Sequence, residues 1–181
     1  MLELSTGATV DDRYTLIERL GQGGTAVVWR GFDDLLQRPV AVKVLHPDIA
    51  ADADLRTMIH QEARAAGRLS HPNITRVYHY GEVTLPGRAS AAYVVMELLE
   101  GHSLSDRLAD GPLPWPEAVL ALAQAAAALA AAHRSGIVHR DVTPTNIMLT
   151  DTGAKVLDFG IAALAGHQGD PEGHRMGTPA Y

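Results

Sequence analysis

Short apolar runs separated by polar turns mark the first half of the chain. Residues 14–20, 26–32, 40–45, 75–83 and 91–98 are rich in β-branched and aromatic side chains, and Gly, Asp or Pro separates most of them. Residues 52–69 follow a helical period instead, with one apolar face made of Leu55, Met58, Ile59, Ala63, Ala66 and Leu69. The pattern predicts five strands, with one helix between the third and the fourth.

The pattern becomes helical after Glu100 and Gly101. Residues 103–109 predict a short helix, and residues 114–135 a long one that tolerates Pro116 in its first turn. Its Ala-rich part, residues 118–132, is interrupted by Gln124 and is too short to span a bilayer, so we expect a buried, closely packed helix. Short strands are expected at 147–149 and 155–157. The fold class is therefore α+β, strand-rich to about residue 99 and helical afterwards.

Composition narrows the classes of function. The chain has 181 residues with 46% hydrophobic content, enough for one sizeable core or two small lobes. The net charge of −6, without runs of like charge, argues against nucleic acid as a partner. The absence of Cys excludes disulfides and thiolate sites. The N-terminus is not a signal peptide and no membrane segment is expected, so a cytoplasmic location is the default.

A glycine-rich segment lies between the first two predicted strands. Glycines let a backbone approach phosphate groups closely and direct N–H groups at them. A glycine-rich hairpin explains the same pattern about equally well, whereas a Rossmann loop is disfavoured because a strand follows instead of a helix. The segment consists of Gly21, Gln22, Gly23, Gly24, Thr25, Ala26, Val27 and Val28.

Lys43 lies on an otherwise apolar strand. Strand alternation places it on the same face as Ala41. A buried ammonium group needs an opposite charge, and Glu62 on the following helix can supply one. The alternative is a solvated lysine on an edge strand. Paired with Glu62, Lys43 is suited to hold the phosphates of a nucleotide.

The most specific signal is the segment 139–146, followed by Asp158, Phe159 and Gly160. Asp141 can accept a proton from an attacking hydroxyl group, and Asn146 and Asp158 can bind a metal ion through a neutral and a charged oxygen. Asp141 is alternatively a turn residue, and Asn146 a strand cap. We interpret His139 as a packed core histidine, and Arg140 as a surface charge or an anion clamp.

In this order, the motifs resemble those of bacterial Hanks-type serine/threonine protein kinases, over residues 14–181. The matching features include the glycine-rich loop, Lys43, Glu62, the segment 70–74 (Ser-His-Pro-Asn-Ile) and the segment 139–146. Asp-Phe-Gly and the final Gly-Thr-Pro-Ala-Tyr complete the set. The resemblance implies a two-lobed kinase fold: a leader at 1–13, a strand-rich N-lobe at 14–98, a hinge at 97–101 and an incomplete C-lobe at 102–181.

The same resemblance implies a site for ATP and Mg²⁺ and transfer of the γ-phosphate to a Ser or Thr hydroxyl of a protein. Asp141 is the implied base, Asn146 and Asp158 the metal ligands, Lys43 the phosphate ligand and Arg140 the clamp of the activation segment. Backbone groups of Glu97 and Leu99 are expected to bind the adenine edge. Its faces are expected to contact Leu20, Val28, Ala41, Met96, Leu99 and Met148.

Three departures lead to further expectations. Thr143 replaces a lysine that is usual in the family, and residues 161–177 contain no Ser, Thr or Tyr to phosphorylate. The chain also ends before the helices that support the catalytic loop, so we expect a truncated domain with little turnover alone, which needs the missing lobe or a partner for stability. The main alternative is an inactive, pseudokinase-like scaffold that binds nucleotide. A small-molecule phosphotransferase is disfavoured by Arg140 and Phe159.

Overall fold

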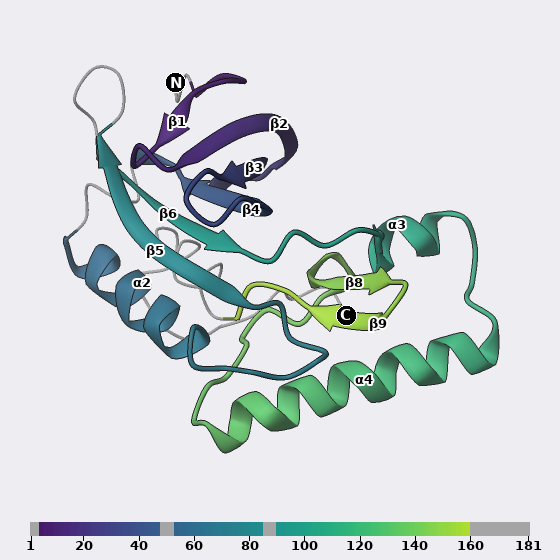
Figure 1. Cartoon of the computed structure of the whole chain (residues 1–181). Coiled ribbons are helices and arrows are strands. Elements are labelled where there is room, and N and C mark those ends of the chain that lie inside the picture. Colours follow the sequence, from purple (N-terminus) through teal and green to yellow (C-terminus); the bar gives the residue numbers. More distant parts are fainter. Residues whose placement is uncertain (1–3, 48–52, 85–89, 160–181) are drawn as a thin grey trace. The chain divides into compact units, whose positions relative to one another are not determined.

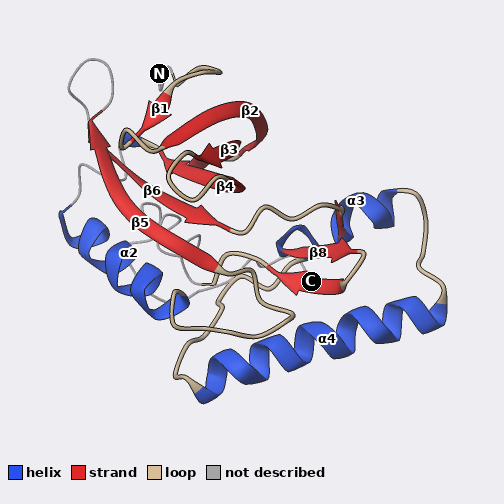
Figure 2. Ribbon diagram, viewed as in Figure 1, coloured by secondary structure: helices blue, strands red, loops and turns tan. Residues whose placement is uncertain are grey.

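The computed structural model describes residues 4–47, 53–84 and 90–159, and only the backbone of residues 53–56, 58 and 62. The chain divides into two compact units. The first unit comprises Met1–Gly67 and Val77–Leu98, and the second comprises Arg68–Arg76 and Leu99–Tyr181. Figures 1 and 2 show the elements of each unit. The segment 68–76 therefore belongs, by its contacts, with the later part of the chain.

The first unit is built on an antiparallel sheet, which has six strands among the described residues, in the order β1-β2-β3-β4-β6-β5. Helix α2 (Ala53–Ala66) packs against β5 (Figure 1). The five strands and the helix expected from the sequence are all present, and the two-residue strand β1 is additional. The strands are β1 (Thr9–Val10), β2 (Tyr14–Gln22), β3 (Ala26–Asp33), β4 (Arg38–Leu45), β5 (Val77–Thr84) and β6 (Ser90–Met96).

One face of this sheet carries an apolar core. Residues paired across antiparallel strands point to the same face, and alternate residues of one strand share a face. Partly buried Leu4 and Ala8 pack on this core from the N-terminal segment. The core consists of Val10, Tyr14, Leu16, Val27, Trp29, Val40, Val42, Val44, Ala91, Tyr93 and Val95.

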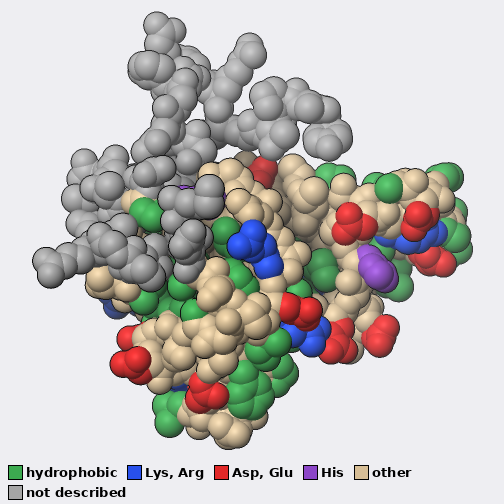
Figure 3. Space-filling view, turned by 90° about the horizontal axis from the view of Figure 1, so that it is seen from above, with side chains coloured by type: hydrophobic (Ala, Val, Ile, Leu, Met, Phe, Trp, Pro, Cys, Tyr) green, Lys and Arg blue, Asp and Glu red, His purple; other side chains and the backbone are tan. Residues whose placement is uncertain are grey.

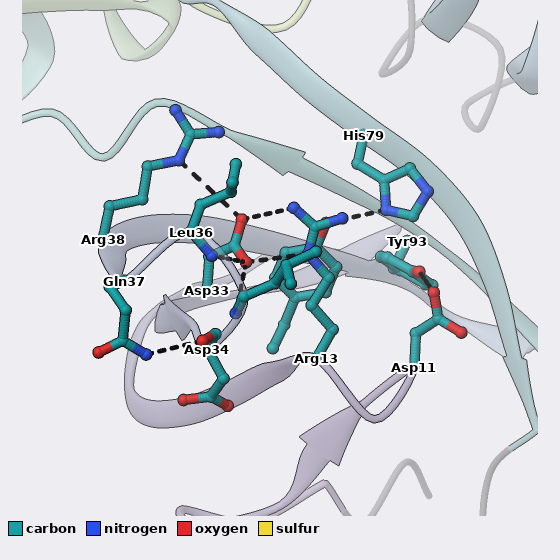
Figure 4. Close-up of polar contacts among 11 residues, drawn as sticks. Asp11, Arg13, Asp33, Asp34, Leu36, Gln37, Arg38, His79 and Tyr93 are labelled. Carbon is teal, nitrogen blue, oxygen red and sulfur yellow. Dashed lines mark hydrogen bonds and ion pairs between the residues drawn. The ribbon is translucent and has the colours of Figure 1, made fainter.

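Polar contacts tie the segment before β2 to the same sheet (Figure 4). The sequence assigned residues 1–13 to a leader outside the domain, but Val10 is fully buried and the Tyr93 hydroxyl donates to Asp11 at 2.7 Å. Arg13 donates two hydrogen bonds to Asp33, at 2.9 and 2.8 Å. Asp33 also accepts the amide of Leu36 at 3.1 Å. This N-terminal segment is therefore an integral layer of the first unit.

The second unit contains a smaller sheet in the order β7-β8-β9. Ser103 precedes α3 and its hydroxyl accepts the amide of Asp106 at 3.0 Å, which caps the helix. The two helices and the strands β8 and β9 occur where the sequence predicted them. The elements are β7 (His102–Ser103), α3 (Leu104–Ala109), α4 (Trp115–Arg134), the 3₁₀ turn η1 (Pro144–Asn146), β8 (Ile147–Thr150) and β9 (Gly153–Val156).

Helix α4 is less buried than its composition suggested. It contacts β9, and its buried residues form one stripe: Ala121, Ala125, Ala128 and Ala132. Leu120 and Leu122 are 58% and 61% exposed. The expectation of a buried, closely packed helix is confirmed for this stripe and wrong for the other faces, because an Ala-rich composition does not show which face packs. By length and composition α4 also suits a membrane span, but a single such helix is weak evidence.

Candidate active site

The glycine-rich segment forms the turn between β2 and β3. Gly23 donates its amide to the carbonyl of Ala26 at 2.9 Å, and Gly21, Gly23 and Gly24 are exposed. A Cβ atom built at Gly21 or Gly24 would meet no atom within 4 Å, and neither has a left-handed φ. Neither packing nor backbone conformation within the described chain explains these two glycines. The open space at both positions is compatible with the close approach of a ligand that the sequence predicted.

Lys43 lies on the face of the sheet opposite the apolar core. It pairs with Val28 on β3 and with Val94 on β6, so the three side chains share a face. Ala41 and Met96 are paired on that same face. The residues of the first unit expected to contact adenine thus gather beside Lys43, except for Leu20, which is exposed near the end of β2.

Lys43 is buried, since the residue is only 5% exposed. A charge buried to this extent requires an opposite charge. Glu62, the partner predicted from the sequence, lies on α2, but its side chain is outside the described part of the structure. The pairing of Lys43 with Glu62 stays a prediction.

In the second unit, His139 is a buried anchor. Its Nε2 donates to the carbonyl of Leu157 at 2.6 Å, and its Nδ1 accepts the amide of Asp141 at 3.3 Å. These two bonds assign the neutral tautomer with its proton on Nε2. The ring also contacts Phe159 edge-on, with centroids 4.8 Å apart. The interpretation of His139 as a packed core residue is confirmed, since it is 1% exposed.

The side chain of Asn146 is oriented by Asp141. Its Nδ2 donates to both the carbonyl oxygen and Oδ2 of Asp141, each at 2.9 Å. Since both amide hydrogens face Asp141, the carboxamide oxygen is the atom that remains to bind a cation. Asn146 also accepts the amide of Leu157 at 2.9 Å through its backbone carbonyl, which places it next to the residue before Asp158.

Two residues here have left-handed backbones: Arg140 at φ 68° and Asp158 at φ 52°. Such conformations are uncommon for non-glycine residues and persist where surrounding contacts hold them. Around Asp158, His139 and Asn146 bind the two backbone groups of Leu157, and Phe159 is buried. The structure thus fixes the conformation of a carboxylate at the end of this strand.

This donor set fits a divalent cation of the Mg²⁺ type. Mg²⁺ is usually bound by one or two protein oxygens together with substrate phosphates and water. Asn146 and Asp158 offer one neutral and one charged oxygen. No cluster of three or more His, Asp or Glu occurs among the residues that the structure describes, so no separate all-protein metal cage competes with this site there.

The remaining site residues belong to one unit or the other. Glu97 and Met96 are in the first unit, and Leu99 and Met148 in the second. Arg140 is exposed, and Thr143 is half-buried with its hydroxyl 2.7 Å from that of Thr145. The activation segment 161–177 lies outside the described residues. On the face in Figure 3, acidic and basic side chains are interspersed, which offers no continuous basic surface there.

Sequence reasoning missed two polar side chains that contact β9. Asn73 donates through Nδ2 to the carbonyl of Ala154 at 2.8 Å. Gln124 accepts the amide of the same Ala154 at 2.7 Å. These partners are 81 and 30 positions away in sequence, so no local pattern announces the contacts. The available signals were the position of Gln124 inside an alanine-rich helix and the place of Asn73 in the segment 70–74.

Comparison with known proteins supports the family suggested by the motifs. The family model of the protein kinase domain matches residues 14–181. The serine/threonine-protein kinase PknA of Mycobacterium tuberculosis is 41% identical over 178 residues, which is 97% of this chain and 41% of PknA. PknL of the same organism is 43% identical over 177 residues, or 96% of this chain and 43% of PknL.

Solved structures agree with this assignment. The kinase domain of Mycobacterium tuberculosis PknI superposes with a TM-score of 0.79 at 33% identity, covering 90% of this chain and 64% of that one. The chain spans well under half the length of PknA and PknL, and corresponds to the N-terminal part of the kinase domain. The chain belongs to the protein kinase family, and its relatives are bacterial serine/threonine kinases.

Proposed function

We propose that this chain binds ATP with Mg²⁺ and forms the part of a protein kinase that transfers the γ-phosphate to a Ser or Thr hydroxyl. The observation that carries the proposal is the geometry of Asn146, whose two bonds to Asp141 leave its oxygen for a metal ion next to Asp158. A turn residue and a strand cap would not require this arrangement.

Each proposed site residue has a role that suits its chemistry. Asp141 accepts the proton of the substrate hydroxyl as its oxygen bonds to the γ-phosphorus and the bond from that phosphorus to ADP breaks, releasing ADP. Asn146 keeps the Asp141 carboxylate oriented. Lys43 binds phosphate oxygens, and backbone N–H groups at the tip of the loop, at Gly24 and Thr25, approach the terminal phosphates. Asn146 and Asp158 would hold a Mg²⁺ ion, which would supply positive charge to neutralise the phosphates. Arg140 binds an anionic group of the activation segment.

Adenine contacts are assigned to Val28, Ala41 and Met96 of the first unit, whose pairing supports the proposal. Leu20, Leu99 and Met148 are included by their place in the family pattern, as are the backbone groups of Glu97 and Leu99. A protein with Ser or Thr acceptors is the proposed substrate, and the cytoplasm the proposed location. The relatives are named kinases, which does not favour the scaffold alternative.

Isothermal titration calorimetry with Mg-ATP tests the binding step. We expect the wild-type chain to bind Mg-ATP, and Lys43→Met and Asp158→Asn each to weaken this binding about tenfold or more, or ~1.4 kcal/mol. Asp141→Asn should bind normally yet abolish transfer of labelled phosphate in the full-length gene product. Arg134→Met, which removes an exposed cation at the end of α4, is the control. Equal Mg-ATP binding by all variants would refute the proposal.

A further inference from the structure

Strand β9 leads directly to Asp158, and partners from outside its hairpin hold its backbone. Ala154 donates to Gln124 and accepts from Asn73, at 2.7 and 2.8 Å. Val156 donates to the carbonyl of Asn73 at 2.8 Å, and its own carbonyl accepts the amide of Thr75 at 3.0 Å. Three sequence-distant parts of the second unit thus hold residues 154–157: α4, the segment 68–76, and residues 139–146.

The peptide of Ala154 is the centre of this arrangement. Its amide is bound by the carboxamide oxygen of Gln124, and its carbonyl by the carboxamide nitrogen of Asn73. Ala154 is 2% exposed, so each bond satisfies a group that has little access to water. Loss of either partner would leave a buried polar group unpaired, which typically costs about 1–3 kcal/mol.

Gly153 shows that the chain makes room for Gln124. Its φ is +114°, and a Cβ atom there would lie 2.6 Å from Nε2 and 2.9 Å from Oε1 of Gln124. The glycine therefore accommodates both the turn and the incoming carboxamide. Gln124 is also the one polar side chain in the central stretch 118–132 of α4. A surface glutamine would need neither the glycine nor the bond to Ala154.

We infer that Gln124 and Asn73 are positioning residues for the metal ligand Asp158, an inference that rests on the function proposed above. They contact neither substrate nor metal, and they act through the backbone of β9. Asp158 has a left-handed backbone, and only Leu157 separates it from Val156, whose amide donates to the backbone carbonyl of Asn73. A small shift of β9 would displace the Asp158 carboxylate relative to the carboxamide oxygen of Asn146. Residues that orient metal ligands typically change metal affinity 10–100-fold when altered.

The test compares isosteric variants of the 181-residue chain. Gln124→Met and Asn73→Asp each remove one bond to Ala154, whereas Gln124→Glu keeps an acceptor oxygen. Leu122→Ala, at a position 61% exposed on α4, is the control. Two quantities are measured: amide hydrogen exchange at 154–157, and the affinity for Mn²⁺ at saturating ADP by electron paramagnetic resonance.

We expect Gln124→Met and Asn73→Asp to accelerate exchange at 154–157 more than tenfold and to weaken Mn²⁺ binding about tenfold. Gln124→Glu and Leu122→Ala should stay near wild type in both. Exchange at buried Ala128 on α4 reports whether the second unit of each variant is folded, and two independent variants guard against one that is not.

Unchanged exchange at 154–157 in both variants would overturn the inference. Faster exchange with unchanged Mn²⁺ affinity would also overturn it, because the bonds would then be structural only. A wild-type chain that binds no Mn²⁺ with ADP would instead refute the proposed function and the metal part of this inference. Exchange would in that case still decide whether Gln124 and Asn73 hold the strand.

Discussion

The imidazole of His139 lies edge-on to the ring of Phe159, with centroids 4.8 Å apart. Its Nε2 donates to the carbonyl of Leu157, just after β9, at 2.6 Å. One side chain thereby joins the segment that carries Asp141 to the segment that carries Asp158. Both rings are almost fully buried, at 1% and 4% exposure. The segments that carry Asp141 and Asp158 are therefore linked through an apolar contact as well as through hydrogen bonds.

His139→Leu should be strongly destabilising. It leaves the amide of Asp141 and the carbonyl of Leu157 without their partner, at a cost of about 2–4 kcal/mol in the free energy of unfolding. Urea unfolding of the second unit measures this difference. His133→Leu, at an exposed position near the end of α4, is the control and should change stability by less than about 0.5 kcal/mol. Similar losses for both variants would contradict the anchoring role.

Gly24→Ala should separate binding from stability. A methyl group there meets no atom within 4 Å, so the melting temperature should stay close to that of the wild type. Mg-ATP affinity should fall about tenfold, because the methyl group occupies the space through which phosphate approaches. Gly101→Ala is the opposite control. Gly101 has φ +142° and its Cβ would collide with the carbonyl of Leu149, so this variant should lose folding stability.

The ion pair of Arg13 and Asp33 should make the folding stability depend on pH in the acidic range. The bidentate hydrogen bonds from Arg13 are the main cause that lowers the pKa of Asp33 from its ordinary value to about 2. Because the pKa of Asp33 is lower in the folded protein than in the unfolded chain, the ion pair stabilises the fold fully at pH values above the unfolded-state pKa. This stabilisation is lost as the pH falls through the folded-state pKa. We expect it to disappear between about pH 4 and pH 2.

Asp33→Asn tests this dependence by urea unfolding. At neutral pH the variant should be less stable by on the order of 1–2 kcal/mol, a figure reduced by solvent screening because Arg13 is partly exposed. The difference from wild type should shrink as pH falls towards 2. Asp34→Asn, on the exposed neighbour, should show no such convergence. A gap that stays constant across this pH range would show that Asp33 acts by packing and not by charge.

Tyr93→Phe should loosen the N-terminal segment without opening the sheet. Burial raises the pKa of Tyr93, so its hydroxyl stays a donor to Asp11 at ordinary pH. Removing this bond should cost about 1 kcal/mol and speed amide exchange at Thr9 and Val10. Exchange in β4 should be unaffected. Tyr14→Phe, which removes a hydroxyl bonded to His79 instead, provides the comparison.

The sequence predicted elements better than faces or contacts. The long helix expected at 114–135 is observed as Trp115–Arg134, because apolar period and Pro116 define it locally. The two-residue strands β1 and β7 were missed, since their existence depends on the partner strand. Motif spacing located Asp141, Asn146 and Asp158, but not the bonds by which Asn146 is oriented. The contacts of Asn73 and Gln124 join residues too distant in sequence to leave a pattern.

The alanine stripe of α4 has a consequence for how the chain responds to heat. A helix that buries mainly methyl groups gains only about 0.8 kcal/mol from each, far less than one that buries leucines. Warming should therefore release α4 before the valine-rich sheet of the first unit melts. When α4 detaches, the hydrogen bond from the amide of Ala154 to Gln124 is lost. The metal site would then fail at a lower temperature than the fold, so a thermal scan that monitors only β-structure would overestimate the range in which the chain is competent.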